Sequence, residues 1–250
     1  TIRDAQGVVT MDDKPSNVVR NGKDTSMWSA IESVRDNEAS VAVSCGNTGA
    51  LMALSMIRLK KLPGVNRPAI AVLYPSTNPQ GFNVLLDVGA DVRADADDLL
   101  RYALMGKSVT EEHKGRTEVK EAQELIRDAA DEAGFEFVGF VEGGDIAGNA
   151  ADVIVTDGFT GNIAIKTGEG TATLIGSGLR QAFKNSIWSR AAALFAYTSL
   201  RRVSKRFDPS NVNGGVFLGL NGTVVKSHGA ADARGVSSAI KLAARLAESE

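Results

Sequence analysis

The residues best suited to chemistry stand at a junction between a predicted strand and a predicted helix, Gly46-Asn47-Thr48-Gly49. Such a junction aims free backbone N–H groups, and the positive end of the helix dipole, at whatever anion lies above it. Gly46 and Gly49 permit a tight turn and close approach of a ligand, while Asn47 and Thr48 add polar side chains that can cap the helix or hold an oxyanion. The junction therefore predicts a site for a small anion, and an ordinary capped loop is the alternative.

A second loop, Asp157 to Asn162, follows an apolar run and opens a helix that carries Lys166. We expect Asp157 to orient a substrate hydroxyl or a basic partner, and Asn162 to cap the helix. Lys166 lies one turn into the helix, where its charge can reach the loop. A capped helix after a tight turn is the alternative. The site residues predicted here are Asn162 for catalysis and Asp157, Gly158, Thr160, Gly161 and Lys166 for substrate binding.

The third loop contains Asn221 and Gly222 and leads along a predicted strand to Lys226 and His228. Alternate residues of a strand lie on one face, so Lys226 and His228 can together neutralise a phosphate or donate a proton. Asn221 and Gly222 are predicted to bind the same anion. A structural role for the histidine is the alternative. The other histidine, His113, lies in a polar loop and is expected to be exposed to solvent.

These loops need a framework that brings strand ends together. Along the 250 residues, apolar runs of strand length alternate with helix-like runs, which predicts an α/β fold with a mostly parallel sheet flanked by helices. In open sheets of this kind, ligands collect beyond the carboxyl ends of the strands. The predicted strands are 40–44, 69–74, 83–88, 136–141 and 153–156, and the predicted helices are 50–60, 95–105, 117–133 and one that opens near 162.

Composition narrows the function further. A formal net charge of -2 and a pI near 5.8 argue against a general nucleic-acid binder. The single cysteine, Cys45, excludes an internal disulfide framework and is expected to be a buried thiol in a reducing cytosol. We see no signal-peptide segment, and no apolar stretch approaches the roughly 20 residues needed to span a bilayer. The expected location is cytoplasmic, at most peripheral to a membrane.

One segment departs from this net acidity, because no acidic residue lies between Gly170 and Phe207. Residues 187, 191, 194 and 198 recur there at helical spacing, Leu194 among them, with Trp188 and Phe195 alongside. The pattern predicts an interfacial amphipathic helix attracted to anionic lipid, or a platform for an acidic protein. A helix whose apolar face packs in a dimer is the alternative. The basic residues of the segment are Arg180, Lys184, Arg190, Arg201, Arg202, Lys205 and Arg206.

Several strings spread over nearly the whole chain carry a family resemblance: SCGNTGALMAL, LLDVGA, EEHKGRTEVKEA, DVIVTDGFTGNIAIKT and GLNGTVVKSHGAADA. Together they resemble the PlsX family of phosphate acyltransferases of bacterial phospholipid synthesis. The resemblance implies transfer of a fatty acyl group from acyl carrier protein to inorganic phosphate, without a cofactor or a metal. It also implies a homodimer related in fold to isocitrate and isopropylmalate dehydrogenases and phosphotransacetylases. A protruding helical hairpin, 163–207 here, would serve dimer and membrane contact.

The chemistry of this family assigns a role to each predicted residue. A thioester is already activated, so the main tasks are to position two reactants and to stabilise an oxyanion. Asn47 and Thr48, with the N–H groups of the 46–49 loop, would hold phosphate or the oxyanion, and Thr160 with Asn162 would complete the cradle. Lys226 and His228 would supply positive charge and a proton for the departing thiolate, with Lys166 a weaker candidate and Asp157 an orienting group. The surface from Arg180 to Arg206 would receive the carrier protein, the membrane or both, and the next acyltransferase of the pathway is a possible further partner.

Two departures from the family pattern concern completeness. The family opens with a strand and a glycine-rich loop, whereas this chain begins with what resembles a later segment, and we expect a further segment of the family, near 106–110, to be absent. We still expect one α/β domain over 1–250.

Two other functions remain open. A dehydrogenase-like or phosphotransacetylase-like enzyme is one, although no metal-ligand cluster and no GxGxxG motif is seen. A non-enzymatic, membrane-associated scaffold is the other, and it leaves the three loops unexplained.

Overall fold

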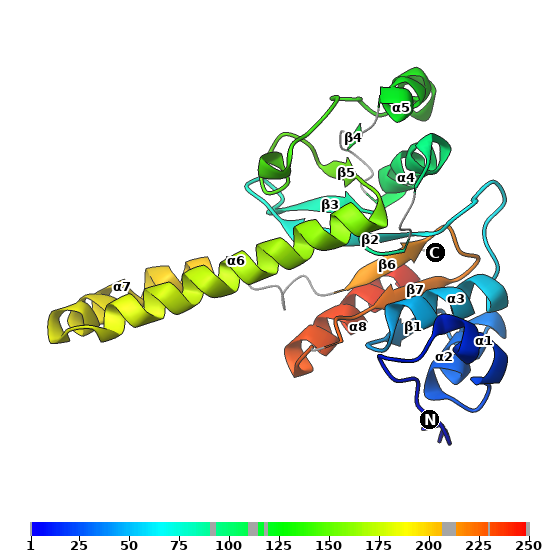
Figure 1. Ribbon diagram of the computed structural model, residues 1–250, viewed down its shortest axis with the longest axis horizontal. Helices are drawn as coiled ribbons and strands as arrows, with labels where there is room; N and C mark the ends of the chain where they lie inside the picture. The colour runs from blue at the N-terminus through cyan, green and yellow to red at the C-terminus, as the bar shows by residue number, and fades with distance from the viewer. Residues whose placement is uncertain are drawn as a thin grey trace.

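The computed structural model describes residues 2–90, 94–109, 115–117, 120–206, 214–229 and 231–248. In this part of the chain, seven strands form one sheet in the order β1-β7-β6-β2-β3-β5-β4 (Figure 1). Helices cover both faces of the sheet, which confirms the predicted α/β fold. The strands are β1 (Val41–Ser44), β2 (Ala69–Pro75), β3 (Phe82–Leu86), β4 (Gly115–Thr117), β5 (Val153–Val155), β6 (Gly215–Leu218) and β7 (Thr223–Lys226).

The sheet is parallel at its two sides and antiparallel in its centre, a feature that the prediction left out. β1 pairs parallel with β7, and β3 and β4 pair parallel with β5, but β7, β6, β2 and β3 alternate in direction. The loops 76–81 and 219–222 join antiparallel neighbours, because a parallel connection needs a dozen or more residues. As a result the carboxyl ends of β1, β7 and β2 lie together along one side of the sheet, which we call the β1/β7 edge. The carboxyl ends of the other strands lie along the opposite side, the opposite edge.

Two layers of helices enclose the sheet. On one face α3 and its neighbours cover Ala42 and Val224, and α6 covers Leu85 and Ile154. On the other face α8 packs on Val225, while α4 and α5 pack on the strands β2, β3 and β5. The helices are α1 (Pro15–Asn21), α2 (Ser26–Arg35), α3 (Thr48–Arg58), α4 (Ala96–Val109), α5 (Lys120–Ala133), α6 (Gly158–Lys184), α7 (Ile187–Arg206) and α8 (Ala233–Glu248), with a 3-10 turn at Gly143–Asp145.

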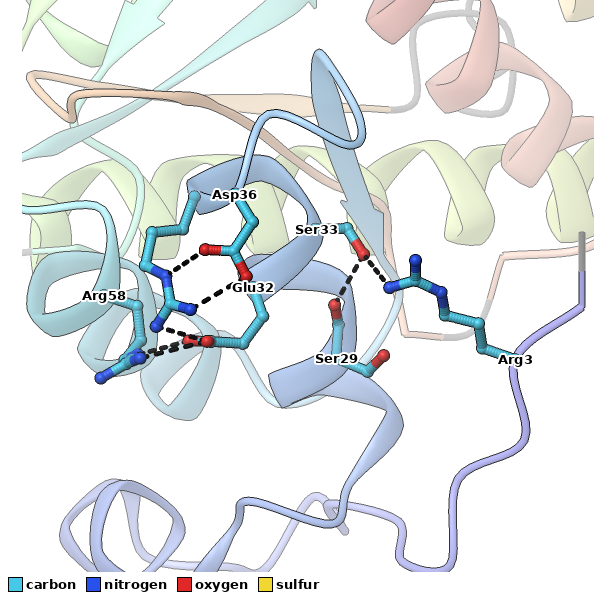
Figure 2. A network of polar contacts seen from close by, with 7 residues as sticks. Arg3, Ser29, Glu32, Ser33, Asp36 and Arg58 are labelled. Carbon is cyan, nitrogen blue, oxygen red and sulfur yellow. Dashed lines mark hydrogen bonds and ion pairs between the residues drawn. The ribbon is translucent and has the colours of Figure 1, made fainter.

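A cluster of ion pairs fastens α2 to α3 (Figure 2). Glu32 on α2 accepts hydrogen bonds from Arg58 on α3 and forms an ion pair with Arg35, which also binds Asp36 at 2.7 Å. The Arg58 guanidinium lies 5.1 Å from the centre of the Trp28 ring, a cation–π distance. We call Glu32, Arg35, Asp36 and Arg58 the α2–α3 cluster. It holds the helix that begins at the 46–49 loop.

The helix α6 is 27 residues long, and its second half leaves the body of the molecule, where α7 runs back beside it (Figure 1). This antiparallel pair lies where the hairpin 163–207 was predicted. Its apolar side chains face solvent: Trp188 is 85% exposed, Leu194 76% and Phe195 89%. Among the described residues, no helix is both long enough and apolar enough to cross a membrane.

Several element boundaries differ from the prediction. Residues 136–141 form no strand, because Gly139 has a φ of 97°, which breaks the extended conformation. The helix expected near 162 begins four residues earlier, at Gly158, and the helix expected from 117 begins at Lys120, with a short strand before it. The predictions of 50–60, 69–74 and 83–88 are confirmed within two residues at each end.

Candidate active site

The β1/β7 edge brings two of the three predicted loops together. Because β1 and β7 are parallel neighbours with Ser44 opposite Lys226, the loop after each strand leaves the sheet at the same place. The Ser227 N–H donates to the Ser44 carbonyl oxygen at 2.9 Å and ties the two loops. The 46–49 loop therefore lies beside Lys226 and His228, as the sequence predicts.

Within the first loop, the side chain of Asn47 holds the structure together. Its Oδ1 accepts from the Ala50 N–H at 3.0 Å and so caps α3. Its Nδ2 lies 3.3, 3.0 and 3.0 Å from the carbonyl oxygens of Thr10, Met11 and Asp13. The predicted contact of this amide with an oxyanion is therefore corrected: in this structure its donors are already used by the 10–13 loop.

In the same loop, backbone N–H groups rather than the Asn47 side chain are available to bind an anion. The N–H groups of Thr48 and Gly49 stand in the first turn of α3 and have no hydrogen-bond partner within the described ranges. Such groups, at the positive end of a helix dipole, bind anions. The N–H of Gly46 instead donates to Ser44 Oγ at 3.2 Å. A side chain on Gly46 would have its Cβ only 2.7 Å from Met27 Cε, so this glycine serves close packing.

Three basic side chains converge on this edge. Lys166 reaches it from α6, with its Nζ 2.8 Å from His228 Nε2 and 2.8 Å from Glu169 Oε2. Lys226 is more enclosed, and its Nζ donates to the Ser227 carbonyl oxygen. Burial lowers the pKa of Lys226, the neighbouring Cys45 raises it, and the charge of Lys166 lowers it further. Among the described residues, Glu169 is the only carboxylate in ion-pair contact with either lysine.

The 157–162 loop lies at the opposite edge, because β5 runs against β1 and β7. Asp157 caps α6 by accepting from the N–H groups of Phe159 and Thr160 at 3.1 and 3.0 Å. The prediction that Asn162 caps the helix is wrong, since α6 begins at Gly158 and Asn162 is an exposed residue inside it. The predicted cradle of Thr160 and Asn162 facing the first loop is corrected for the same reason of strand direction.

The glycines of this second loop serve packing. Gly158 and Gly161 are both buried, and a Cβ on Gly161 would stand 1.9 Å from the Asp87 carbonyl oxygen. No side chain fits at that distance, so Gly161 is what lets α6 approach the ends of β3 and β5. From there α6 crosses the sheet, and this crossing, rather than the loop itself, delivers Lys166 to the β1/β7 edge.

Asn221 and Gly222 also lie at the opposite edge, in the turn that connects β6 to β7. The Asn221 N–H donates to the Lys60 carbonyl oxygen at 3.0 Å, and Gly222 has a φ of 149° with Val34 close above it. Both residues line a shallow cavity of about 510 Å³ with Arg35 and Ser40. The structure thus separates them from Lys226 by the length of a strand.

Sequence reasoning missed Glu169 and Tyr74. Glu169 is three residues after Lys166, a spacing that places both on one helix face and that the sequence displays. Tyr74 is the last residue but one of β2, and its hydroxyl lies against α6: a Cβ on Gly168 would be 2.1 Å from that oxygen. Burial, and then the charge of Glu169, raise the pKa of Tyr74. Cys45, predicted to be buried, is a half-buried free thiol beside Lys226.

The predictions for His113 and for partner contact by the basic residues of the hairpin remain predictions. His113 lies outside the described residues. Over the described ranges, no group of three or more His, Cys, Asp or Glu side chains could hold a metal ion. The basic residues predicted for partner contact lie on the hairpin, and the exposed ones among them are Arg180, Lys184, Arg190, Arg201 and Arg202.

The fold has relatives among solved structures. The chain is similar to a phosphotransacetylase from Streptococcus pyogenes, with a TM-score of 0.57 and 18% identity over 89% of this chain and 67% of that one. A phosphotransacetylase from Staphylococcus aureus gives a TM-score of 0.54 and 14% identity over 93% of this chain and 74% of that one. At such low identity the likeness defines the fold class, which is that of the phosphotransacetylases.

Sequence comparison narrows the class to a family. A model of the family described as fatty acid synthesis protein matches residues 1–110 and 108–250. Curated phosphate acyltransferases are similar throughout: one from Roseobacter denitrificans is 74% identical over 98% of this chain and 74% of its own length, and one from Ruegeria sp. is 71% identical over 99% and 71%. The chain belongs to the fatty acid synthesis protein family. The resemblance and the prediction of an acyltransferase are confirmed.

Proposed function

We propose that this chain transfers an acyl group from the thioester of acyl carrier protein to inorganic phosphate and releases acyl phosphate. The observation that carries the proposal is the β1/β7 edge. There β1 leads into α3, whose Thr48 and Gly49 amides have no partner within the described ranges, and the neighbouring strand β7 ends at Lys226, followed by His228 in contact with Lys166. Positive charge and free N–H groups at a helix N-terminus suit a phosphate. The names of the relatives, phosphate acyltransferase, support the same substrate.

The proposed reaction needs no covalent intermediate on the protein. A phosphate oxygen attacks the thioester carbonyl carbon, and a C–O bond forms as the carbonyl oxygen becomes an oxyanion. The C–S bond then breaks, and the sulfur leaves as a thiolate that takes up a proton. In our assignment Lys226 and the amides of Thr48 and Gly49 bind the phosphate, while Lys166 and His228 stand beside the reacting atoms. The protein contributes mainly position and electrostatic stabilisation.

The test supplies purified protein with an acyl-carrier-protein thioester and phosphate, and follows thioester loss and acyl phosphate together. We expect equal amounts of both changes, with no turnover when sulfate replaces phosphate. Thioester loss that does not depend on phosphate would overturn the proposal. A parallel reaction with a coenzyme A thioester separates the alternatives, because preference for that donor indicates a phosphotransacetylase-like enzyme.

We further propose that the hairpin of α6 and α7 makes the contacts with larger partners. Its exposed Trp188, Leu194 and Phe195 form an apolar surface, and arginines and lysines on the same pair of helices add positive charge. Apolar side chains beside basic ones suit the inner face of an anionic membrane and a second copy of the chain, and the basic residues suit an acidic carrier protein. The proposed location is therefore cytoplasmic and peripheral to the membrane.

Two measurements test the hairpin. In liposome flotation with anionic vesicles, the wild type is expected to float and the double variant Trp188→Glu with Leu194→Glu is expected to stay below. The matched control carries Leu125→Glu and Ile240→Glu, two exposed apolar residues of α5 and α8, and should float like the wild type. Light scattering then reports whether the same hairpin variant loses a dimer. Equal flotation of all three proteins contradicts the membrane contact.

A further inference from the structure

We propose that Tyr74 is a positioning residue of the anion site: its hydroxyl occupies the space that the missing side chain of Gly168 leaves, and this contact fixes where α6 holds Lys166. The effect on turnover rests on the proposed function. The contact and its effect on Lys166 do not, and they can be measured on the protein without substrates.

One face of α6 contacts the sheet over two helical turns. Gly161 lies against the Asp87 carbonyl, and Ile165, one turn further, packs on the apolar cluster that includes Leu85. Gly168 follows after another turn. Positions three, four and seven apart lie on one side of a helix, so these three residues form a single row that faces the sheet. The contacts of this row determine how α6 lies on the sheet.

Tyr74 makes the last contact of the row. A Cβ on Gly168 would lie 2.1 Å from the Tyr74 hydroxyl oxygen and 3.2 Å from the ring carbon Cζ, so the hydroxyl reaches a place that a side chain would otherwise fill. Tyr74 packs on the same apolar cluster as Ile165, which limits the freedom of its ring. Two residues further the contact is over, because a Cβ on Gly170 would have no described atom within 4 Å. The hydroxyl of Tyr74 therefore sets the distance between α6 and the end of β2.

Lys166 lies between the second and the third contact of the row, so the position of the helix governs the position of its ammonium. Its Nζ is 2.8 Å from Glu169 Oε2 on the same helix and 2.8 Å from His228 Nε2 on the loop after β7. A displaced helix carries Lys166 and Glu169 together, so the ammonium cannot stay at His228 without leaving Glu169. A shift of about 1 Å is enough to lose one of these hydrogen bonds.

Alanine in place of Gly168 is expected to move the helix by this amount. The shortest ordinary contact of a Cβ is about 3.4 Å, so Gly168→Ala forces the Tyr74 hydroxyl and the helix apart by roughly 1.3 Å. The helix yields more readily than the packed ring, because it soon leaves the body of the molecule, where Leu174 is 71% exposed (Figure 1). Lys166, two residues from the new methyl group, then moves by about 1 Å.

The first test uses the protein without substrates and reads the imidazole NMR signal of His228. The chain has two histidines, and His113→Gln identifies the signal of His228. Whatever other contacts this ring makes, a positive charge 2.8 Å from Nε2 influences its chemical shifts. We expect Gly168→Ala to move the signal toward that of Lys166→Met. Adding Tyr74→Phe should move it back, because the methyl group then takes the place of the hydroxyl and Cζ has to give way by only a few tenths of an ångström.

Gly170→Ala is the matched control, since it makes the same change two residues further along the helix and meets no described atom. It should leave the His228 signal unchanged. A signal that Gly168→Ala does not move, or that Tyr74→Phe does not restore, overturns the positioning role.

Urea denaturation tests the contact itself. Alanine favours a helix more than glycine does, so Gly170→Ala should raise the denaturation midpoint. Gly168→Ala should lower it, and Tyr74→Phe on that background should raise it again. If Gly168→Ala alone does not fold, recovery of folded protein by Tyr74→Phe is the same result, and failure to recover it overturns the contact. Equal midpoints for Gly168→Ala and Gly170→Ala overturn it as well.

Turnover is the third readout. We expect Gly168→Ala to lower kcat of acyl phosphate formation about tenfold and to change the KM for phosphate by less than about threefold, because we assign phosphate to Lys226 and the α3 amides. Tyr74→Phe on that background should restore most of kcat, and a double variant as slow as Gly168→Ala overturns the inference. A wild type without phosphate-dependent turnover overturns the proposed function, and the NMR and denaturation measurements then decide the inference by themselves.

Discussion

The α2–α3 cluster and the β1/β7 edge are both assemblies of partly buried charge, but only one of them is balanced. In the cluster, Arg35 and Arg58 meet Glu32 and Asp36, two charges of each sign (Figure 2). At the edge, Glu169 pairs with Lys166, and no carboxylate of the described residues forms an ion pair with Lys226. A balanced assembly stabilises the helices that carry it. An assembly with surplus positive charge attracts an anion from outside.

The surplus of positive charge at the β1/β7 edge disfavours the charged form of a lysine there, which a site with only a structural role would avoid. Burial and the neighbouring Lys166 lower the pKa of Lys226, which means that the folded protein disfavours its charged form. Bound phosphate would reverse this, since a negative charge favours the ammonium. The comparison thus separates residues that stabilise the fold from residues that we assign to the anion site, and four measurements test it.

The largest expected effect is that of Lys226→Met. Removing this ammonium should lower kcat/KM for phosphate about a hundredfold, because one charged donor to the anion is lost. Thermal unfolding should occur at the same or a higher temperature, because the charged form is disfavoured in the folded state at neutral pH. An active variant would remove Lys226 from the anion site, and a variant that unfolds earlier would make it a structural residue.

The pH dependence of phosphate binding is the second effect. Only the charged form of Lys226 attracts phosphate, and its pKa lies below the ordinary 10.5 of a lysine. As pH rises, the charge is therefore lost earlier than at an exposed lysine, and the KM for phosphate should climb toward tenfold per pH unit beyond that pKa. Lys226→Arg, which stays charged, should give a flat profile in the same range. Parallel profiles for the two proteins would contradict the assignment.

Arg58→Met addresses the balanced cluster and should affect stability alone. The variant loses the ion pair with Glu32 and the contact with Trp28, and Arg35 remains to neutralise Glu32. We expect a loss of about 1–2 kcal/mol in the free energy of unfolding, measured by urea denaturation. The kcat/KM for phosphate should be unchanged. A large loss of activity would show that the two regions are coupled.

Arg3→Ala is expected to have the smallest effect. Arg3 pairs with Glu38 at 2.6 Å, but the two side chains are 55% and 48% exposed, and solvent screens the pair. The expected loss is between about 0.2 and 1 kcal/mol by the same denaturation measurement, and it should shrink further in high salt. A greater loss would place Arg3 inside the balanced cluster, through its hydrogen bond to Ser33.

The predictable part of the site is the part that local sequence controls. Gly46, Asn47 and Gly49 mark a strand-to-helix junction within a few residues, and their position beside Lys226 requires only that β1 and β7 be parallel neighbours. The α/β fold, most long elements and the hairpin follow from hydrophobic periodicity in the same way.

The unpredictable part depends on strand direction and helix crossing. Nothing near Asp157 states that β5 runs against β7, so the loop was placed at the wrong edge. The DGFTGN string offers two good capping residues, Asp157 and Asn162, and the choice between them is set by where α6 meets Asp87. Glu169 lies at the site because α6 crosses the sheet, and Tyr74 because β2 ends at the same edge as β1 and β7. No spacing along the chain indicates either.

The helix α6 runs without interruption from the sheet to the tip of the hairpin, so a rigid movement of one end also moves the other. Gly161 lies against the Asp87 carbonyl and is taken as the pivot. Lys166 is about 8 Å along the helix from it, and Lys184, at the tip, is about 35 Å along. For a rigid helix turning at Gly161, a displacement of about 5 Å at the tip moves Lys166 by about 1 Å, enough to separate it from His228. For a rigid helix, a partner that displaced the tip of the hairpin would therefore also move Lys166 relative to His228.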